Sequence, residues 1–455
     1  MKFLFITKPF FIEPLGIMYI SSAIRKLGHD VDLAITSEDL YKKMELFNPD
    51  FVGYSIMTGD QDFYDNLNRD LKSRFKFFSI AGGPHPTFFP EFLENSSFDA
   101  ICLGEGETAI QQFLNNPYSL QISNFWFKTN NGIIKNPVQP LIDSLDNIPF
   151  PDRGIVFKFQ QIKEGPIKHF IASRGCPFNC SYCFNESFSK LYNGKGRRTR
   201  FRSVDNLLEE IKQVIENSPT RFVYFQDDTF TLDSNWLKEF AEKYPQKIRL
   251  PFHCHIRPNT LNEETASLLK NAGCYSAHIA AESGNDHLRN QILNRNMTKE
   301  QIISASKLLK KNDIKFMLQN ILGIPEGNLE SDIETLELNI ECQPDYAWVS
   351  IFQPYPGTKL GEFCKEKGYY SGDFRDLGNN FFDSSKLNFS EEYKLQLANM
   401  QKLFAIFVEY PDLYKVGLLS VLINLPQTES TKKVFQEIYK KFRNLGDRRL
   451  YGFDL

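Results

Sequence analysis

The first 115 residues or so alternate between short apolar runs and longer segments with helical spacing. Apolar runs of five or six residues are typical of strands that are buried on both faces of a parallel sheet. The runs predict strands at residues 2–6, 30–35, 51–56, 77–81 and 98–103. Helical spacing at about 17–27, at about 60–74 and after the last strand fills the gaps between them. This alternation predicts a doubly wound, Rossmann-like parallel sheet.

A second β–α alternation begins near His169. Before it, Asn130-Asn131-Gly132 signals a hairpin turn, and prolines interrupt residues 147–153 as in a linker. Strands are predicted at 168–173, 221–226, 250–256, 275–280, 315–321 and 346–352. Helices are predicted between them at about 203–217, 234–243, 262–271, 299–311 and 329–340. Six such units predict a partial (β/α)6 barrel of the TIM type, with its chemistry at the carboxyl ends of the strands.

The end of the chain has a different pattern. Helical spacing at 390–409, 411–423 and 429–445 predicts a small, mostly helical domain, whose many aromatic residues we interpret as core. The predicted organisation is therefore a first domain at 1–140, a linker at 141–165, the barrel at 166–360 and a C-terminal helical domain at 361–455.

Composition narrows the class of protein. The 455 residues carry a formal net charge of -3, which gives no overall basic field for nucleic acid. The basic run Lys195–Arg202 is interpreted as a solvated loop, with an anion contact as the alternative. No stretch reaches the roughly 20 apolar residues that span a bilayer, and Met1–Ile6 is too short an apolar run for a signal peptide. We therefore expect a cytoplasmic protein.

Three cysteines lie within eight residues. Cys176, Cys180 and Cys183 are separated by three and then by two residues. Thiolates hold the irons of iron–sulfur clusters, and three of them leave one iron of a [4Fe–4S] cluster open to another ligand. The alternatives are a zinc knuckle, or a disulfide pair beside a third cysteine. Structural zinc sites usually combine paired C-x2-C elements, and the sequence has no second pair.

The C-x3-C-x-aromatic-C pattern, with Tyr182 as the aromatic residue, resembles the signature of radical S-adenosylmethionine (SAM) enzymes. In that family SAM chelates the open iron, and an electron from the cluster cleaves it to methionine and a 5′-deoxyadenosyl radical. The resemblance implies that Cys176, Cys180 and Cys183 bind the cluster. It also implies that Tyr182 lies beside the adenine, and that the cluster is oxygen-sensitive.

The later strand ends match further motifs of this family. Gln226-Asp227-Asp228 matches a segment that contacts the SAM amino group, although paired carboxylates also serve as metal ligands or helix N-caps. Glu282-Ser283-Gly284 matches a segment that contacts the ribose and the amino group. Asn320 to Glu326 matches a turn at the adenine. The predicted SAM contacts are Tyr182, Gln226, Asp227, Asp228, Arg257, Glu282, Ser283, Asn320 and Gly323.

The third strand of the barrel ends in His253-Cys254-His255-Ile256-Arg257. Arg257 is a candidate for the SAM carboxylate or for the substrate, because a guanidinium group pairs with a carboxylate through two hydrogen bonds. The two histidines share one face of the strand, as in a zinc site. No third ligand is evident in the sequence, so we interpret them as pocket lining and Cys254 as core.

Three turns follow strands of the first sheet: Pro14-Leu15-Gly16, residues 82–87 and residues 104–107. Their order resembles the cobalamin-binding domain of B12-dependent radical SAM enzymes. A nucleotide-binding domain is disfavoured because G-x-G-x-x-G does not follow the first strand. The D-x-H-x-x-G motif is also absent, so no histidine is expected to coordinate cobalt. His85 is expected to shape its loop or to contact the edge of the corrin ring. The implied cobalamin contacts are Pro14, Leu15, Gly16, Ser55, Gly82, Gly83, Pro84, His85, Gly104 and Glu105.

The resemblance implies a cobalamin-dependent radical SAM enzyme, and methyl transfer to an unactivated carbon is the leading hypothesis. The 5′-deoxyadenosyl radical would abstract a substrate hydrogen, and the substrate radical would take a methyl group from methylcobalamin facing the barrel mouth. The alternative is a cyclisation, ring contraction, dehydration or oxidation with the same cofactors. A non-catalytic sensor and a methylthiotransferase are disfavoured. Expected partners are a small or medium organic substrate, with a peptide still open, and an external reductant such as flavodoxin or ferredoxin.

Overall fold

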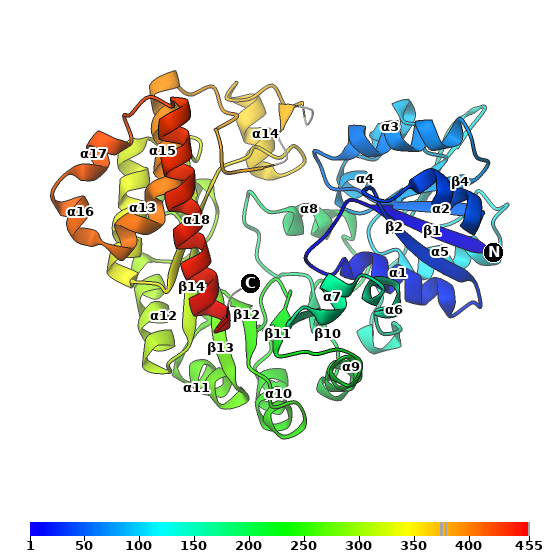
Figure 1. The fold of residues 1–455 in the computed structure, drawn as a ribbon, viewed down its shortest axis with the longest axis horizontal. Helices are drawn as coiled ribbons and strands as arrows, with labels where there is room; N and C mark the ends of the chain where they lie inside the picture. Colours follow the sequence, from blue (N-terminus) through cyan, green and yellow to red (C-terminus); the bar gives the residue numbers. More distant parts are fainter. Residues whose placement is uncertain (374–375, 378–379, 454–455) are drawn as a thin grey trace. The chain divides into compact units, whose positions relative to one another are not determined.

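The computed structural model describes residues 1–373, 376–377 and 380–453 (Figure 1). The chain divides into two compact units, Met1–Phe170 with Ser187–Thr220 and Ile171–Glu186 with Arg221–Leu455. Helix α9 (Val204–Asn217), which the sequence assigned to the barrel segment, belongs to the first unit. The C-terminal helices belong to the second unit and do not form a unit of their own.

The first unit is built on a sheet with the strand order β2-β1-β3-β4-β5-β6-β7. Neighbouring strands from β2 to β5 pair in parallel, which confirms the doubly wound sheet. The strands are β1 (Lys2–Thr7), β2 (Asp30–Ile35), β3 (Phe51–Ser55), β4 (Phe78–Gly82) and β5 (Ala100–Cys102). The order reverses direction between β1 and β3, and ligands of such sheets bind beyond the strand ends at this point.

Helices of the first unit connect these strands. They are α1 (Leu15–Arg25), α2 (Leu40–Phe47), α3 (Gln61–Lys72), α4 (Pro84–Phe88), η1 (Pro90–Asn95) and α5 (Glu107–Asn115). Helix α2 was not predicted from the sequence; it begins at an Asp39 N-cap whose side chain accepts from the Lys42 amide. It also treated the Pro84–Phe88 segment as a turn, whereas proline in the first helical position starts a short helix there.

The predicted hairpin turn is confirmed, and it extends the first sheet. Strands β6 (Phe125–Thr129) and β7 (Gly132–Lys135) pair antiparallel, with Thr129 opposite Gly132. Phenylalanines from β6 pack into the core under α5, and the Phe113 and Phe125 ring centroids are 5.1 Å apart in a stacked arrangement. The connection continues through η2 (Leu145–Asn147), α6 (Gly154–Phe157), α7 (Gln160–Glu164) and β8 (Ile167–Phe170).

The basic run Lys195–Arg202 is not simply a solvated loop. Arg200 is 4% exposed and pairs with Glu105, with 2.7 Å between Arg200 Nη2 and Glu105 Oε1. Arg202 is also 4% exposed and pairs with Glu210. Both guanidinium groups therefore pair with buried carboxylates of the same unit, which corrects the interpretation for Arg200 and Arg202, while Arg197 is exposed as predicted.

The second unit is built on a sheet of parallel strands. They are β11 (Phe222–Phe225), β12 (Phe252–Ile256), β13 (Cys274–Glu282), β14 (Lys315–Leu322) and β15 (Tyr346–Ile351), and each pairs in parallel with the next. The connecting helices are α10 (Ser234–Lys247), α11 (Glu263–Ala272), α12 (Lys299–Lys311) and α13 (Leu329–Cys342). These elements match five of the six strands and four of the five helices that the sequence predicted for the barrel, whereas β8 and α9 belong to the first unit.

The C-terminal helices are α14 (Lys359–Glu366), α15 (Glu391–Glu409), α16 (Pro411–Lys415), α17 (Leu418–Leu422) and α18 (Glu429–Tyr451). Helices α15 and α18 pack against barrel strands, and α16 and α17 pack against α15. Apolar residues of α15 join one core with β15 and α13, including Leu403, Val349 and Leu336. The segment predicted as one helix at 411–423 is divided at Gly417, whose φ of 77° is left-handed. Helix α18 continues six residues beyond its predicted end.

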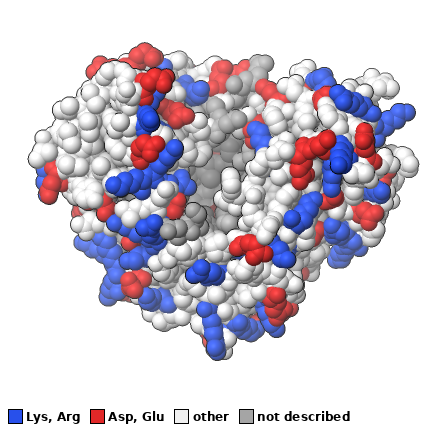
Figure 2. Space-filling model, in the orientation of Figure 1, with Lys and Arg blue, Asp and Glu red and all other residues white. Residues whose placement is uncertain are grey.

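Charged side chains of both signs are interspersed on the surface that Figure 2 shows. This distribution agrees with the small net charge of the sequence. Among the described residues, no helix combines the length and the apolar character needed to cross a membrane.

Candidate active site

The three cysteines lie on one loop of the second unit. The loop follows β9 (Ser173–Arg174), turns at Gly175 with a φ of 85°, and ends at α8 (Phe184–Leu191). Cys176, Cys180 and Cys183 are free thiols, and the Cys183 amide donates to the Cys180 carbonyl at 3.2 Å. Burial raises the pKa of Cys183 to about 12 and also raises that of Cys176. Bound iron would replace these protons, so the donor set fits a cluster.

Asp227 anchors the base of the cysteine loop. Its carboxylate accepts from the Ser173 amide at 2.5 Å and from the Ala172 amide at 3.1 Å. Burial raises the pKa of Asp227 to about 6, although these hydrogen bonds oppose the shift. Both carboxylate oxygens are thus engaged by the strand that leads into the loop. Asp227 positions the loop, while the neighbouring Asp228 is exposed.

Two arginines lie against the sulfur of Cys180. Arg257 Nη1 is 3.5 Å from Cys180 Sγ, and Arg295 Nη1 is 4.0 Å from it. The Arg257 guanidinium also lies 3.9 Å from the ring centroid of Phe178. The two guanidinium groups thus place positive charge beside a sulfur that would bind an iron of the cluster. Arg257 is thus a predicted site residue that the structure brings to the cysteine loop.

Tyr182 and Glu282, two of the predicted site residues, are in direct contact. The Tyr182 hydroxyl donates to Glu282 Oε1 at 2.7 Å and accepts from Arg295 Nη1 at 3.0 Å. Arg295 completes the group, with 3.7 Å between its Nη1 and Glu282 Oε1. Glu282 has a left-handed φ of 65°, a strained conformation typical of functional sites. Ser283 is buried next to it, and its Oγ accepts from the Asn285 amide at 3.2 Å.

The turn after β14 is held from two sides. Gly323 has a φ of 65°, and its amide donates to Asp332 Oδ1 at 3.1 Å. The other oxygen of Asp332 accepts from the Tyr393 hydroxyl of α15 at 2.6 Å. Burial raises the pKa of Asp332 to about 7, although both hydrogen bonds lower it. The C-terminal segment therefore supports the turn that the resemblance places at the adenine.

Asn320 does not join this group. Its Nδ2 donates to the Leu318 carbonyl, the Trp348 carbonyl and Asn339 Oδ1 at 3.0–3.1 Å. Its Oδ1 accepts from Asn339 Nδ2 at 2.9 Å. Asn320 is 0% exposed, and its whole amide is engaged between β14, β15 and α13. Gln226 is half-buried at the end of β11.

The strand ends of the first unit leave an open, partly apolar rim. Gly16 is exposed, and a Cβ atom built there meets no heavy atom within 4 Å. Phe11 is 91% exposed and Met57 is 57% exposed, after β1 and β3 respectively. Exposed apolar side chains beside small residues at the switch point would suit a large, flat ligand with an apolar face. Pro14, Leu15, Ser55, Gly82, Gly83 and Pro84 lie at the same strand ends.

Three residues of the predicted rim pack against other parts of the first unit. His85 is 0% exposed, its Nδ1 is 3.2 Å from Thr58 Oγ1, and its ring packs against Phe89 and Phe92. Burial lowers the pKa of His85 to about 4. The Glu105 carboxylate is held by Arg200, and a Cβ at Gly104 would lie 2.0 Å from the Tyr192 hydroxyl. Packing within the protein therefore accounts for these residues.

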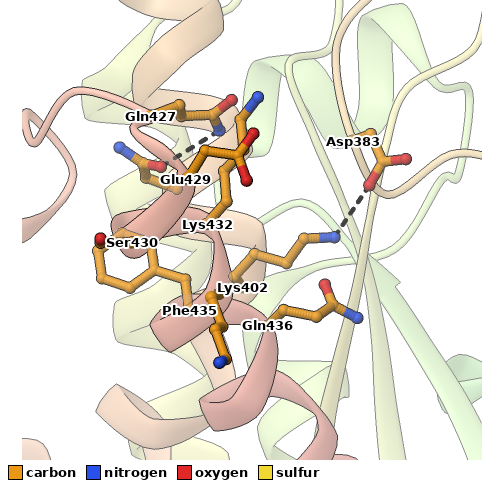
Figure 3. Close-up of a pocket in the computed structure, with 10 residues that line it drawn as sticks. Asp383, Lys402, Gln427, Glu429, Ser430, Lys432, Phe435 and Gln436 are labelled. Carbon is orange, nitrogen blue, oxygen red and sulfur yellow. Dashed lines mark hydrogen bonds and ion pairs between the residues drawn. The ribbon is translucent and has the colours of Figure 1, made fainter.

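A cavity of about 780 Å³ lies elsewhere in the second unit (Figure 3). Its lining includes Phe435 and an ion pair in which Lys402 Nζ is 3.2 Å from Asp383 Oδ1. None of its lining residues is among the predicted site residues, and we assign no chemistry to it.

The structure adds residues that sequence reasoning missed. Arg295, Asp332 and His278 contact site residues or predicted pocket residues, and none of the three belongs to a recognised motif. The sequence offers one local signal for Arg295, which is the asparagine on each side of it. In the structure these two asparagines adopt left-handed φ angles of 52° and 51°. Asparagine tolerates that region, so the Asn-Arg-Asn sequence predicts a sharp turn.

The cysteine loop is linked through Tyr182 to Glu282 and Arg295, in a unit built on parallel strands. This arrangement is that of a radical SAM centre, and comparison with known proteins gives the same family. The model of the Radical SAM superfamily matches residues 170–338, and that of the B12 binding domain matches residues 1–114. An uncharacterized methyltransferase of Pyrococcus horikoshii is 31% identical over 366 residues, which cover 77% of this chain and 78% of the relative. The chain belongs to the radical SAM enzymes that carry a B12 binding domain.

More distant relatives differ in the reaction that their names give. Cytidylyl-2-hydroxyethylphosphonate methyltransferase of Streptomyces wedmorensis is 24% identical, and the match covers 78% of each chain. Anaerobic magnesium-protoporphyrin IX monomethyl ester cyclase of Cereibacter sphaeroides is 25% identical across 83% of this chain and 62% of its own length.

Solved structures share the fold. The cobalamin-dependent SAM radical enzyme OxsB superposes with a TM-score of 0.72 over 99% of this chain and 71% of its own, at 15% identity. The radical SAM methyltransferase TsrM from Kitasatospora setae gives 0.67 over 80% and 76%, at 16% identity. Family membership assigns three cofactors to the chain: a [4Fe–4S] cluster, SAM and cobalamin.

Proposed function

We propose that this protein is a cobalamin-dependent radical SAM methyltransferase that methylates an unactivated carbon. The observation that carries the proposal is the cysteine loop with Arg257 and Arg295 at Cys180, in a chain that also contains a B12 binding domain. The name of the 31% identical relative, a methyltransferase, supports methyl transfer as the outcome.

The cofactors supply reductive cleavage of SAM and delivery of the methyl group. The chain's own residues bind and orient them. Cys176, Cys180 and Cys183 would hold the cluster, and the two arginines at Cys180 would offset negative charge on it. Glu282, held by Tyr182 and Arg295, would accept hydrogen bonds from ribose hydroxyls, which are donors. The rim at Gly16 would seat the cobalamin.

The first experiment reconstitutes the chain anaerobically with iron, sulfide and hydroxocobalamin. We expect about one [4Fe–4S] cluster and one cobalamin per chain, with a base-off cobalamin spectrum. The Cys180→Ser variant is expected to lose the cluster and keep cobalamin, while Cys364→Ser, which changes a core thiol, keeps both. Retention of the cluster without any cobalamin in the wild-type chain would contradict the proposal.

The second experiment identifies the reaction with a panel of organic substrates. Methyl transfer yields S-adenosylhomocysteine and a product heavier by about 14 Da. Formation of 5′-deoxyadenosine with a changed product but no S-adenosylhomocysteine would instead indicate a radical rearrangement or cyclisation. The 25% identical cyclase keeps this second function open.

A reduced cluster requires an electron donor, for which we propose a flavodoxin or ferredoxin in the cytoplasm. The substrate is proposed to be a small or medium organic molecule, including peptides. Turnover supported by a reduced flavodoxin, in the absence of a chemical reductant, would establish the donor class. If only a chemical reductant supports turnover, flavodoxin is excluded as the donor.

A further inference from the structure

Three histidines converge inside the second unit. His253 and His255 share one face of β12, and the strand register pairs His255 with His278 of β13. One ligating atom of each histidine lies within 4.8 Å of one ligating atom of each of the others. The tertiary structure thus provides the third imidazole that the sequence did not reveal beside the His253–His255 pair.

The hydrogen bonds of His253 determine which of its nitrogens carries the proton. The Ser276 hydroxyl donates its single hydrogen to the Leu450 carbonyl at 2.6 Å. Ser276 Oγ, which is 2.7 Å from His253 Nδ1, must therefore accept a hydrogen from that nitrogen. The lone pair of His253 then lies on Nε2. Histidines that bind metals almost always donate their other N–H group to an oxygen in this way.

Burial keeps the other two imidazoles neutral. It lowers the pKa of His255 to about 4, and it lowers that of His278 well below its usual value, helped by His255 and Arg443. The charge of Arg443 is offset, since its Nε is 3.2 Å from Asp447 Oδ2. A neutral imidazole has the free lone pair that a metal ion requires.

His278 supplies a separate observation. Its side chain is only 9% exposed, and its Nε2 has no hydrogen-bond partner among the described residues. Its Nδ1 lies 3.4 Å from the Tyr224 hydroxyl and 3.5 Å from Gln319 Nε2. A buried ring nitrogen without a partner loses its hydration and gains nothing in return, unless a ligand binds there.

We propose that His253, His255 and His278 bind one divalent transition-metal ion of the Zn²⁺ type. Imidazole nitrogens suit such ions, and three protein ligands leave a position for water or for an oxygen of the substrate. Tetrahedral bonds of ~2.1 Å place ligand atoms about 3.4 Å apart, so the rings must rotate closer together when the ion binds. Tyr224 stands beside this position, with its hydroxyl 3.0 Å from His255 Nε2. This metal is additional to the iron of the cluster and the cobalt of cobalamin.

The test is zinc binding by the full-length chain with its cluster reconstituted, so that the cysteine loop is occupied. Zn²⁺ is titrated against a chromophoric chelator, and bound zinc is counted by mass spectrometry after gel filtration. We expect about one Zn²⁺ per chain and a Kd that rises at least tenfold in His253→Gln and in His278→Gln. The matched control is His287→Gln, because that side chain is 62% exposed and is not one of the three converging histidines. The control should keep the wild-type affinity.

Ser276→Ala tests the arrangement without removing a ligand. It keeps all three imidazoles but removes the acceptor of the His253 Nδ1–H group, and we expect zinc affinity to fall about tenfold. If the histidine variants do not fold, the melting temperature of the wild-type holoprotein decides the question. It should rise with Zn²⁺ and not with Mg²⁺, because binding to the folded state stabilises it.

Three results would overturn the proposal. The first is that the wild-type holoprotein binds far less than one Zn²⁺ per chain and shows no rise in melting temperature with Zn²⁺. Folded His253→Gln and His278→Gln could bind zinc as tightly as the wild type. Zinc could also disappear in Cys180→Ser and persist in His278→Gln, which would assign the ion to the cysteine loop.

Discussion

The Tyr182 hydroxyl donates a 2.7 Å hydrogen bond to Glu282 Oε1 across 100 residues of sequence. Tyr182 lies on the cysteine loop, and Glu282 lies at the end of β13. Arg295 bonds to the same hydroxyl and holds the two side chains in one charged group. Hydrogen bonds therefore connect the cysteine loop directly to the proposed ribose-binding carboxylate of Glu282.

Removal of this hydroxyl should weaken SAM binding. In Tyr182→Phe, Glu282 loses its donor and is less well oriented for the ribose. A lost buried hydrogen bond of about 1–2 kcal/mol corresponds to roughly a five- to thirty-fold rise in Kd for SAM. Equilibrium dialysis with the reconstituted chain measures this change. Tyr414→Phe is the matched control, because its hydroxyl bonds to Glu337 on an exposed surface. Equal SAM affinity in Tyr182→Phe and the wild type would remove Tyr182 from the site.

The rim of the first unit predicts a variant that separates folding from cofactor binding. In Gly16→Ala the new methyl group meets no protein atom within 4 Å, and alanine favours helix α1 by up to about 1 kcal/mol. We expect an unchanged or slightly higher free energy of unfolding of the apoprotein, together with a severalfold loss of bound cobalamin. Denaturant titration and cobalamin absorbance measure the two effects. Full cobalamin retention would show that the cofactor does not approach Gly16.

Cobalt should have no ligand from His85. The ring is fully buried against Phe89 and Phe92, so it cannot act as a ligand at the rim without unpacking this core. The electron paramagnetic resonance spectrum of the cob(II)alamin form should therefore show no hyperfine coupling to histidine nitrogen. Labelling all histidines with 15N should leave the spectrum unchanged. A hyperfine splitting that changes on 15N labelling would show that a histidine of the chain binds cobalt.

Stability should depend on pH through Asp332. Its folded-state pKa of about 7 lies above the usual value of 3.8, so the folded protein binds this proton more tightly than the unfolded chain. The stabilisation is fully present below pH 4, and it is lost as the pH rises toward and through 7. Asp332→Asn keeps the shape and cannot ionise.

The free energy of unfolding of the wild-type apoprotein, minus that of Asp332→Asn, should therefore fall between about pH 4 and pH 7 and level off above it. Asp313→Asn serves as a control, because its side chain is 79% exposed. A difference that stays constant across this range would mean that Asp332 titrates normally.

Local pattern was sufficient to predict most of the fold. Strand β2 matches its predicted range of 30–35, and α12 matches its predicted range of 299–311. Apolar periodicity identifies such elements because it records which face each residue buries. The cysteine spacing was equally local, since a cluster is bound by thiolates that one short loop can bring together.

The sequence by itself determined the two α/β segments, the cluster loop and the family of the protein. Only the tertiary structure decided what the polar residues at the strand ends contact. Asp227 anchors the cysteine loop, Asn320 joins α13, and His278 completes a set of three imidazoles. These roles depend on partners that are about 20 to 55 residues away in the chain. Strand register and helix packing bring such partners together, and no short-range pattern in a single sequence records them.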